Sequence, residues 1–331
     1  MSAAFPLPRL PEWCWSGELP GVLELAAARP GPHVAIFALV HGNEPAGAAA
    51  LLQLCELGIR PARGRLTLCF ANPQAYAAYD PSRPAQARFL DEDLNRLWDD
   101  NLLDRPAASR ERARARQLRS LVRQVDFLLD LHSMQVPGEP LLLCHPTAKA
   151  VAFALRLGIP ATVVSDPGHE SGRRLIDYSA FADPERPGIA LLLEAGCHRQ
   201  RRTVETALAA VLRFLDVCGI LDPADAARFA PRPWGREPRL VRVEERVTVR
   251  RGPFRLVEPA ASLRIVPRAG TTIAFDGGRA VRTPFDDCVL LLPAPSAPPG
   301  HTALRLGRLA RPVAALTRPG AEPGSASAAR R

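Results

Sequence analysis

Short apolar runs and longer amphipathic stretches alternate along the first two-thirds of the chain. Near-continuous, partly β-branched apolar runs are typical of strands buried on both faces of a parallel sheet, whereas alanine-rich or amphipathic stretches that end at glycine are typical of helices. We therefore expect strands at residues 34–40, 65–70, 125–131, 140–144, 161–164 and 188–193, and helices at 45–57, 105–124, 147–157 and 204–218. This alternation predicts an α/β fold with a mixed, mainly parallel sheet flanked by helices.

The composition of the chain changes after residue 222. Residues 223–238 are rich in proline and arginine, which is typical of a linker. Beyond them, short strand-like runs broken by glycine and proline predict a small C-terminal all-β domain at residues 239–317. Residues 318–331 are mostly Gly, Ala, Ser, Pro and Arg, and we expect them to be disordered. Residues 1–222 then form the first and larger domain.

The overall composition is that of a globular protein, with 47% apolar and 23% charged residues. No apolar stretch approaches the roughly 20 residues needed to span a bilayer, and the first ten residues lack a signal-peptide pattern, so we expect a cytoplasmic protein. The seven cysteines are scattered, without a Cys-x-x-Cys pair, which favours reduced thiols over disulfides or a cysteine-based metal site.

The net charge of +9 comes from arginine, because Lys149 is the sole lysine. Residues 105–123 carry seven arginines on one expected helix, which could indicate a nucleic-acid-binding face. No interleaved aromatic residues or nucleic-acid-binding motif accompany them, so a solvated helix face is the better interpretation. We expect neither nucleic acid nor membrane as a partner, and the sequence leaves open whether the chain forms a homo-oligomer.

Two of the expected strands are followed by residues of the types that commonly bind metals. His41 and Glu44 follow the strand at residues 34–40, and His132 follows the strand at residues 125–131. The carboxyl ends of strands in an open α/β sheet face a crevice where ligands bind. Two histidines and one glutamate, with a fourth position left for water, are a common ligand set of catalytic zinc, so we expect one zinc ion per subunit. Asp130 either orients His132 or has a plain structural role.

A third strand end supplies a candidate general base. Glu194 follows the apolar strand at residues 188–193 and precedes small residues. Metal-assisted hydrolysis of an amide needs a base that takes a proton from water and delivers it to the leaving nitrogen. Glu194 fits this role. His198, four residues later, either lines the same pocket or lies at the surface, and the surface is the default expectation.

The segment Arg88-Phe-Leu-Asp-Glu-Asp-Leu-Asn95-Arg96 supplies groups for substrate binding. A positioned cation such as Arg88 can stabilise the negative charge that develops on a carbonyl oxygen. An Asn–Arg pair, here Asn95 and Arg96, suits recognition of a substrate carboxylate.

Four motifs occur in this order: HGNEP (41–45), RFLDEDLNR (88–96), DLH (130–132) and LLLEAG (191–196). Together they resemble the succinylglutamate desuccinylase and aspartoacylase family, a branch of the zinc carboxypeptidase fold, over roughly residues 30 to 300. The resemblance implies that residues 1–222 are a deacylase catalytic domain and that the C-terminal β domain partly covers the site entrance. It also implies roles for the residues that match the motifs: zinc ligation by His41, Glu44 and His132, general-base catalysis by Glu194, polarisation of the scissile carbonyl by Arg88, and carboxylate binding by Asn95 and Arg96.

The chain departs from the family pattern at Pro184. Characterised members place an arginine ten residues before the base glutamate, where it binds a second substrate carboxylate. Arg173 and Arg174, or Arg186, are the nearby substitutes, and Arg173 and Arg174 lie in a glycine-flanked segment that suits a substrate loop. Tyr178 is a further candidate for substrate binding or for packing.

These features favour a zinc-dependent hydrolase that cleaves the amide bond of a small N-acylated amino acid or related amine. The alternative is a zinc carboxypeptidase acting on peptides, in which Asn95 and Arg96 anchor the C-terminal carboxylate. A non-catalytic binding protein on the same fold is the third hypothesis. The presence of every ligand and of the base weakens it.

Overall fold

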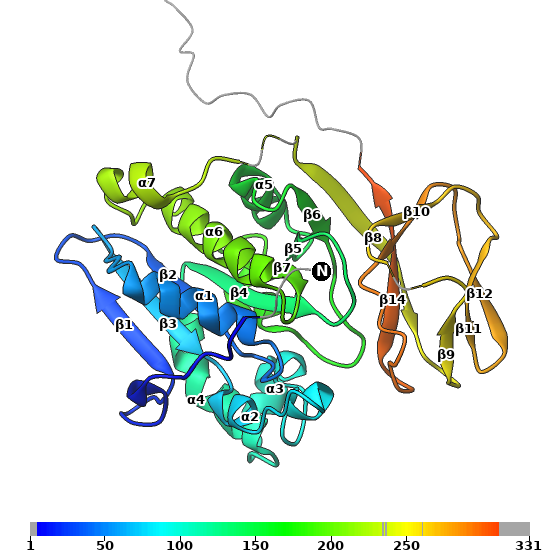
Figure 1. Cartoon of the computed structure of the whole chain (residues 1–331), viewed down its shortest axis with the longest axis horizontal. Coiled ribbons are helices and arrows are strands. Elements are labelled where there is room, and N and C mark those ends of the chain that lie inside the picture. Colours follow the sequence, from blue (N-terminus) through cyan, green and yellow to red (C-terminus); the bar gives the residue numbers. More distant parts are fainter. Residues whose placement is uncertain (1–4, 234, 236, 260, 311–331) are drawn as a thin grey trace, which may run out of the picture.

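One large sheet runs through the molecule (Figure 1). We describe the chain from a computed structural model in which residues 5–310 are described, except residues 234, 236 and 260. The sheet contains eleven strands, in the order β1 (Val22–Ala26), β3 (Arg65–Phe70), β2 (His33–Ala38), β4 (Phe127–Met134), β7 (Ile189–Cys197), β5 (Leu141–Cys144), β6 (Thr162–Ser165), β8 (Arg239–Thr248), β14 (Thr302–Leu309), β13 (Cys288–Leu291) and β10 (Arg264–Val266).

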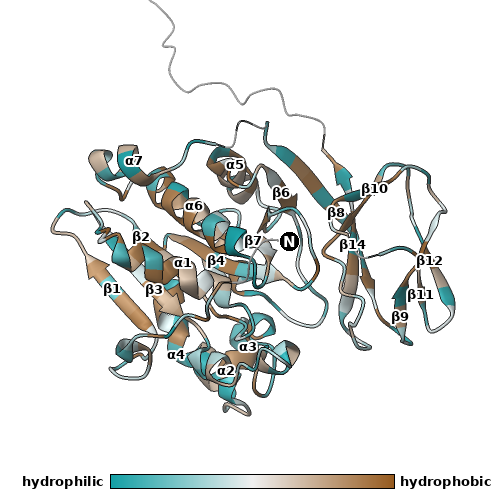
Figure 2. Ribbon diagram, viewed as in Figure 1, coloured by the Kyte–Doolittle hydropathy of each residue, from teal (hydrophilic) through white to brown (hydrophobic). Residues whose placement is uncertain are grey.

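The middle of this sheet is parallel and buried on both faces. Strands β3, β2, β4 and β7 run parallel to one another, and β5 is antiparallel to β7. All six residues of β2 are buried, as are seven of the eight in β4, which explains their near-continuous apolar sequences. The brown strands at the centre of Figure 2 show this apolar core. The predicted mixed, mainly parallel α/β sheet is confirmed.

Helices cover both faces of the sheet. Helices α1 (Pro45–Glu56), α5 (Ala148–Leu157) and α6 (Arg201–Val217) pack on one face and share one apolar core with the strands. Helix α4 (Arg110–Arg123) contributes Ala115, Leu118 and Val122 to the core on the opposite face. The remaining helices are short: α2 (Pro73–Ala77), α3 (Asp100–Leu103) and α7 (Pro223–Phe229), with 3₁₀ turns at Glu12–Cys14, Pro84–Ala87, Leu94–Arg96, Leu175–Asp177 and Ser179–Phe181.

Local sequence explains where several helices begin and end. The side chain of Ser109 accepts a hydrogen bond from the backbone N–H of Arg112 and so caps α4. Helix α5 ends at Gly158, whose φ of 67° is a left-handed conformation that glycine adopts without strain. Each expected helix is present with similar bounds, although the helix expected at residues 105–124 begins only at Arg110.

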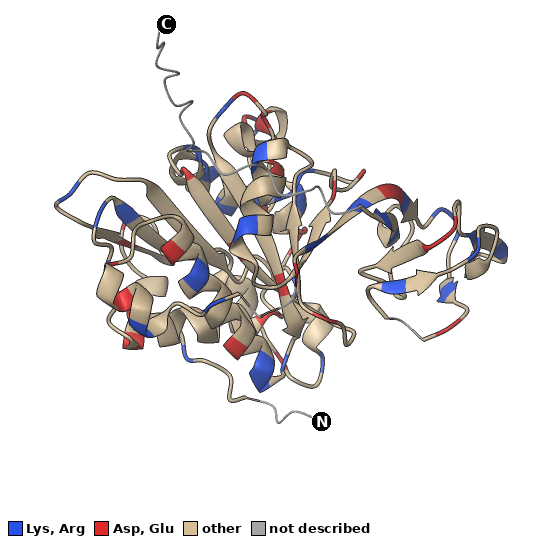
Figure 3. Cartoon of the chain, turned by 90° about the horizontal axis from the view of Figure 1, so that it is seen from above, with Lys and Arg blue, Asp and Glu red and all other residues tan. Residues whose placement is uncertain are grey.

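Four of the six arginines of α4 are paired with acidic residues, and the other two bond to backbone carbonyls. Arg110 lies 2.6 Å from Asp91 and Arg112 lies 3.2 Å from Glu92, while Arg119 contacts Asp104. Figure 3 shows basic positions (blue) and acidic positions (red) interspersed along the chain. This helix therefore carries an ion-paired face and not a bare cationic one.

The C-terminal strands extend the main sheet. Strand β8 pairs parallel with β6 of the α/β part, and β14, β13 and β10 follow it in antiparallel order. A second sheet contains β12 (Arg279–Arg282), β11 (Thr272–Asp276) and β9 (Phe254–Leu256). The two sheets enclose their own apolar core, seen at the right of Figure 1. The expected all-β character of this region is present, but hydrogen bonds join it to the first part through β6 and β8.

Three features differ from the sequence-based expectations. Strand β1 was not expected, and it pairs antiparallel with β3 at the sheet edge. The segment expected to be a linker begins with α7. Strands β4 and β7 continue to Met134 and Cys197, so His132 and Glu194 lie within strands and not after them. The tail expected to be disordered, residues 318–331, lies outside the described residues.

Within the described residues, no helix is both long and apolar enough to cross a membrane.

Candidate active site

The three expected metal ligands converge at the carboxyl ends of β2 and β4. His41 and Glu44 belong to the turn between β2 and α1, while His132 comes from the neighbouring parallel strand β4. All three side chains are buried, and one donor atom from each lies within 4.8 Å of the others. Gly42 permits the close approach of α2 to this turn, because a Cβ atom there would lie 2.4 Å from the backbone of Ala75. The spacing His-x-x-Glu therefore brings both ligands to one point.

A carboxylate holds the far nitrogen of each imidazole. Asp130 Oδ2 lies 2.8 Å from His132 Nε2, and Asp93 Oδ1 lies 2.9 Å from His41 Nε2. The Nδ1 atoms of both rings face Glu44, at 2.8 Å for His41 and 3.2 Å for His132. At His132, a proton on Nε2 that is donated to Asp130 leaves the Nδ1 lone pair free for a metal, which is a recurrent arrangement at metal sites. At His41, the Nη2 of Arg88 also lies 2.9 Å from Nε2, beside Asp93. This donor set fits a divalent metal such as zinc.

The charges of the cluster are strongly coupled. Burial raises the pKa of Glu44, but the imidazoles of His132 and His41 outweigh it and bring the pKa well below its ordinary value. Burial lowers the pKa of His132, but Asp130 and Glu44 outweigh it and bring the pKa well above its ordinary value. Glu44 is thus held ionised, as a metal ligand requires.

Glu194 faces this cluster from the next strand. In the β4–β7 register it lies directly opposite His132. Burial and then the charge of Glu44 raise the pKa of Glu194 to about 8. Its Oε2 atom is buried and has no hydrogen-bond partner among the described residues. A carboxyl group with a raised pKa beside a candidate metal site is suited to proton transfer near neutral pH.

Arg88 lies beside the same ligands. Its Nη2 donates to Asp93 Oδ2 at 3.1 Å, and its Nη1 lies 3.6 Å from Glu44 Oε1. Burial lowers the pKa of Arg88, but Asp93 and Glu44 outweigh it and raise the pKa above its ordinary value. A permanent cation therefore stands beside the candidate metal ligands.

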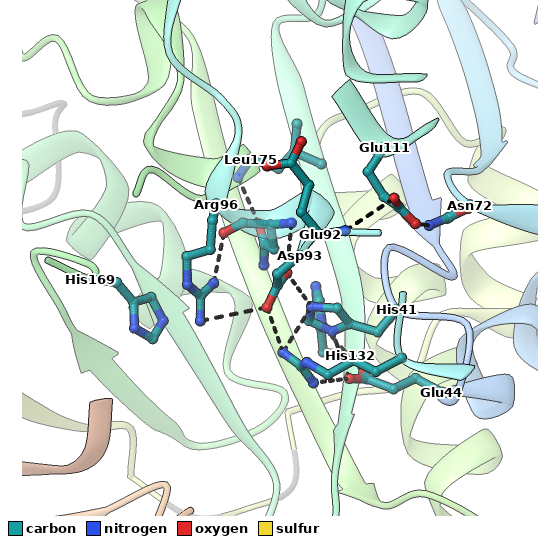
Figure 4. Close-up of polar contacts among 12 residues, drawn as sticks. His41, Glu44, Asn72, Glu92, Asp93, Arg96, Glu111, His132, His169 and Leu175 are labelled. Carbon is teal, nitrogen blue, oxygen red and sulfur yellow. Dashed lines mark hydrogen bonds and ion pairs between the residues drawn. The ribbon is translucent and has the colours of Figure 1, made fainter. Parts of the chain in front are cut away.

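Asn95 and Arg96 also line the cavity, and Figure 4 shows Arg96 beside Asp93. The Arg96 Nη1 donates to the Asn95 carbonyl at 2.7 Å, and its Nη2 lies 3.9 Å from Asp93. Its Nε is buried without a partner among the described residues. Burial lowers the pKa of Arg96 to about 10, with neighbouring arginines adding to the effect. Arg96 is thus a partly buried cation with unused donor capacity, which favours an anionic ligand.

The loop that carries these residues is held by Glu111 of α4. This buried carboxylate accepts hydrogen bonds from the backbone N–H groups of Leu90, Asp91 and Glu92 and from the side chain of Asn72 (Figure 4). The anchored loop places Arg88, Asp93 and Arg96 toward the cavity.

All of these groups border one cavity of about 420 Å³. The candidate metal ligands, Arg88, Asn95, Arg96 and Glu194 line it, and His198 lines it too, with its Nδ1 2.8 Å from Ser133 Oγ. The C-terminal strands and their connecting loop supply the opposite wall, including Leu292, Pro298 and Arg305. This wall narrows the space available to a substrate.

The residues expected in the substrate loop separate into two groups. Arg174 lines the cavity, but it is fully paired with Asp166 and Asp177. Arg173 does not line the cavity, because its side chain is 62% exposed and lies 3.3 Å from Asp99. Substrate binding by Arg173 is therefore not supported by its position.

Tyr178 is buried outside the cavity lining. Its hydroxyl donates to Asp100, and its ring lies 5.6 Å from that of Trp98. The position of Tyr178 therefore fits a packing role. Arg186, the other substitute for a second carboxylate-binding arginine, uses its backbone carbonyl to accept from Lys149. Neither Arg186 nor Pro184 is among the residues that line the cavity.

Sequence reasoning missed several residues of the site. Asp93 lies inside the motif RFLDEDLNR, so its proximity to His41 had a signal in the sequence. Arg305 and His169 also line the cavity, and they had no local signal, because one comes from β14 and the other from a loop far away in the chain.

Comparisons with known proteins agree with this geometry. The model of the succinylglutamate desuccinylase/aspartoacylase catalytic domain matches residues 30–216, more than half of the chain. The chain therefore belongs to the succinylglutamate desuccinylase/aspartoacylase family, as the resemblance of its motifs indicated. No protein with a curated description matches the sequence.

Solved structures show that the fold extends over most of the chain. The chain is similar to succinylglutamate desuccinylase from Vibrio parahaemolyticus, with 21% identity, a TM-score of 0.63, and coverage of 88% of this chain and 86% of that chain. It is similar to a succinylglutamate desuccinylase/aspartoacylase from Rhodobacter sphaeroides, with 18% identity, a TM-score of 0.62, and coverage of 88% and 89%. The product-bound ectoine utilization protein EutE (DoeB) from Ruegeria pomeroyi matches with 18% identity, a TM-score of 0.58, and coverage of 92% and 97%.

Proposed function

We propose that the chain is a zinc-dependent hydrolase that cleaves the amide bond of a small N-acylated amino acid or related amine. The observation that carries this proposal is the meeting of three buried ligand side chains with Glu194 at one cavity. Membership of the desuccinylase/aspartoacylase family supports the same reaction class.

His41, Glu44 and His132 would hold the metal, with Asp93 and Asp130 orienting the two imidazoles. The metal would supply Lewis acidity and activate water for attack. Two histidines and one carboxylate favour zinc among the available metals, because imidazole suits zinc and the carboxylate adds charge.

Glu194 takes up a proton from the attacking water and returns it to the amide nitrogen as the carbon–nitrogen bond breaks. The products are a carboxylate and a free amine, so the proton moves from oxygen to nitrogen without a further reactant. Arg88 donates to the carbonyl oxygen, which gains negative charge during the attack. The Asn95 side-chain amide and the Arg96 guanidinium bind the carboxylate of the amino acid.

The size of the cavity favours a small substrate over a peptide. Leu292, Pro298 and Thr302 of the C-terminal region close the side opposite Arg88 and Arg96. A carboxypeptidase needs an open groove for the peptide that precedes the scissile bond. The alternative of a zinc carboxypeptidase is therefore not favoured.

The proposal is tested by hydrolysis of N-acetyl, N-succinyl and N-formyl amino acids by zinc-loaded protein, beside a panel of short peptides. Turnover of an acyl compound that is lost in Glu194→Gln supports the deacylase. The metal content of the variant is the control, because a variant that keeps zinc and loses turnover has lost only the base. Turnover of peptides alone would contradict the proposal.

A further inference from the structure

Arg305 reaches the cavity from β14, a strand of the C-terminal region. Its side chain is 5% exposed. The Nε donates to Asp166 Oδ2 and one Nη donates to His169 Nε2, each at 2.8 Å. Two of the three guanidinium nitrogens are therefore engaged by the segment that follows β6, so this side chain is placed to hold that segment.

The bond to His169 defines the tautomer of that ring. A guanidinium only donates, so Nε2 must accept, and Nδ1 then carries the proton that it donates to Thr302 Oγ1 at 3.1 Å. Burial, and then the charges of Arg305, Arg96 and Arg174, lower the pKa of His169, which keeps the ring neutral as this pattern requires. His169 is thus tied to β14 at Thr302 and at Arg305.

Asp166 connects Arg305 to the rest of the segment. The same Oδ2 atom accepts from Arg174 at 2.8 Å, and Arg174 also donates to Asp177 at 2.7 Å. Arg174 and Asp166 are almost completely buried. An incomplete network of buried charges is costly, so the loss of one member disturbs the others.

The segment in turn contacts the candidate carboxylate-binding pair. The backbone N–H of Leu175 donates to Asn95 Oδ1 at 2.8 Å (Figure 4), and that of Trp98 donates to the carbonyl of Arg173 at 3.3 Å. A Cβ atom at Gly172 would lie 2.2 Å from the carbonyl oxygen of Arg96, so glycine is required for this close approach. Residues 172–175 therefore support the backbone that carries Asn95 and Arg96.

We infer that Arg305 is a positioning residue for Asn95 and Arg96, acting through Asp166 and His169, so that selectivity for a substrate carboxylate depends on the C-terminal strands. This inference rests on the proposed function, in which Asn95 and Arg96 bind the carboxylate. It gives the C-terminal region a role in recognising the substrate, in addition to forming one wall of the cavity. A displacement of the pair on the order of 1 Å is enough to lower the rate about a hundredfold.

The test compares two substrates of the full-length, zinc-loaded protein: an N-acyl amino acid that the enzyme hydrolyses, and the N-acyl amine that lacks only its carboxylate. In Arg305→Met, we expect KM for the amino acid to rise about ten- to a hundredfold while its kcat changes less, and kcat/KM for the amine to stay within about twofold. The selectivity for the carboxylate should fall accordingly. An equal loss on both substrates, or no loss, would overturn the inference.

Three further variants separate positioning from a general effect. Arg305→Lys keeps the charge but not the fork that reaches two partners, so it should give a partial loss. His169→Leu removes the partner of the Arg305 hydrogen bond and should also lower the selectivity for the substrate carboxylate. Arg308→Met is the matched control, because Arg308 lies on the same strand, exposed, over the ring of Phe285, and it should change neither substrate.

A second measurement is independent of activity. In Arg305→Met, the backbone amides of Leu175 and Trp98 should exchange hydrogen about tenfold faster than in the wild type, and in Arg308→Met at the wild-type rate. If the wild type hydrolyses no N-acyl compound, the proposed function fails, yet faster exchange would still support the coupling. Unchanged exchange in Arg305→Met would overturn the coupling whatever the substrate.

Discussion

The two ends of the cavity are built differently. The candidate metal ligands and Glu194 come from β4, from β7 and from the turn that follows β2, and these three strands are neighbours at the centre of the sheet. The arginine-rich end comes from a loop after α2, a loop after β6 and strand β14. In the proposed function, proton transfer and metal binding would thus rest on the core of the sheet, whereas recognition would rest on loops and on the C-terminal strands. This division lets substrate preference vary while the chemistry is preserved.

The largest effect is expected from a substitution at the end of the cavity that carries the candidate metal ligands and Glu194. Replacing Glu194 with glutamine removes the base and keeps the shape, so kcat should fall about 10²- to 10⁴-fold while KM changes little. Steady-state kinetics with a substrate found in the panel measures this. A loss below about tenfold would show that another group transfers the proton.

The second prediction concerns the carboxylates behind the ligands. Asp130→Asn and Asp93→Asn should each weaken metal affinity about 10- to 100-fold, because each imidazole loses the carboxylate that orients it. Competition with a chelator of known affinity measures the change. Asp126→Asn serves as control: it precedes the same strand as Asp130 but bonds to the backbone of His33, and metal affinity should not respond.

The third prediction concerns the arginine-rich end of the cavity. Arg96→Met should raise KM for an N-acyl amino acid about tenfold or more, because a charge-assisted hydrogen bond to the carboxylate is lost. Metal affinity should be unchanged, which is opposite to the expectation for Asp130→Asn. An Arg96 variant with normal KM and weakened metal binding would contradict the division between the two ends.

The fourth prediction is a pH dependence of activity. Glu194 acts as a base only when ionised, so kcat/KM should rise with pH through its pKa. Burial and Glu44 raise that pKa to about 8, and the charge of a bound divalent metal lowers it, so the midpoint should fall below 8 in the metal-loaded enzyme. The acidic limb of the pH–rate profile measures it. Activity that increases toward acidic pH would argue against Glu194 as the base.

The smallest effect on activity is expected at Tyr178, which lines neither end of the cavity. Tyr178→Phe should leave kcat and KM within about twofold and reduce the free energy of unfolding by about 1 kcal/mol through the lost hydrogen bond to Asp100. Denaturant unfolding measures the loss of stability, and steady-state kinetics on the same sample measures kcat and KM. A selective rise in KM would instead place Tyr178 at the substrate.

The strands of the α/β part could be predicted from the sequence because burial on both faces leaves a continuous apolar run, as in β2 and β4. Strand β1 escaped prediction because it lies at the sheet edge, where none of its residues is fully buried and partly buried and exposed positions are mixed. The ends of β4 and β7 were placed too early, since their polar residues His132 and Glu194 continue the strand at the cavity.

The sequence by itself determined the α/β class, the four ordered motifs and hence the family, together with the candidate ligands, the base and the Arg88–Arg96 segment. Each of these has a local pattern: an apolar run, a short spacing, or a polar residue after a strand. Only the tertiary structure decided that Arg173 and Tyr178 lie outside the cavity, and that Arg305 and His169 line it. Such contacts join residues far apart in the chain, and no local pattern specifies which distant segments the sheet brings together.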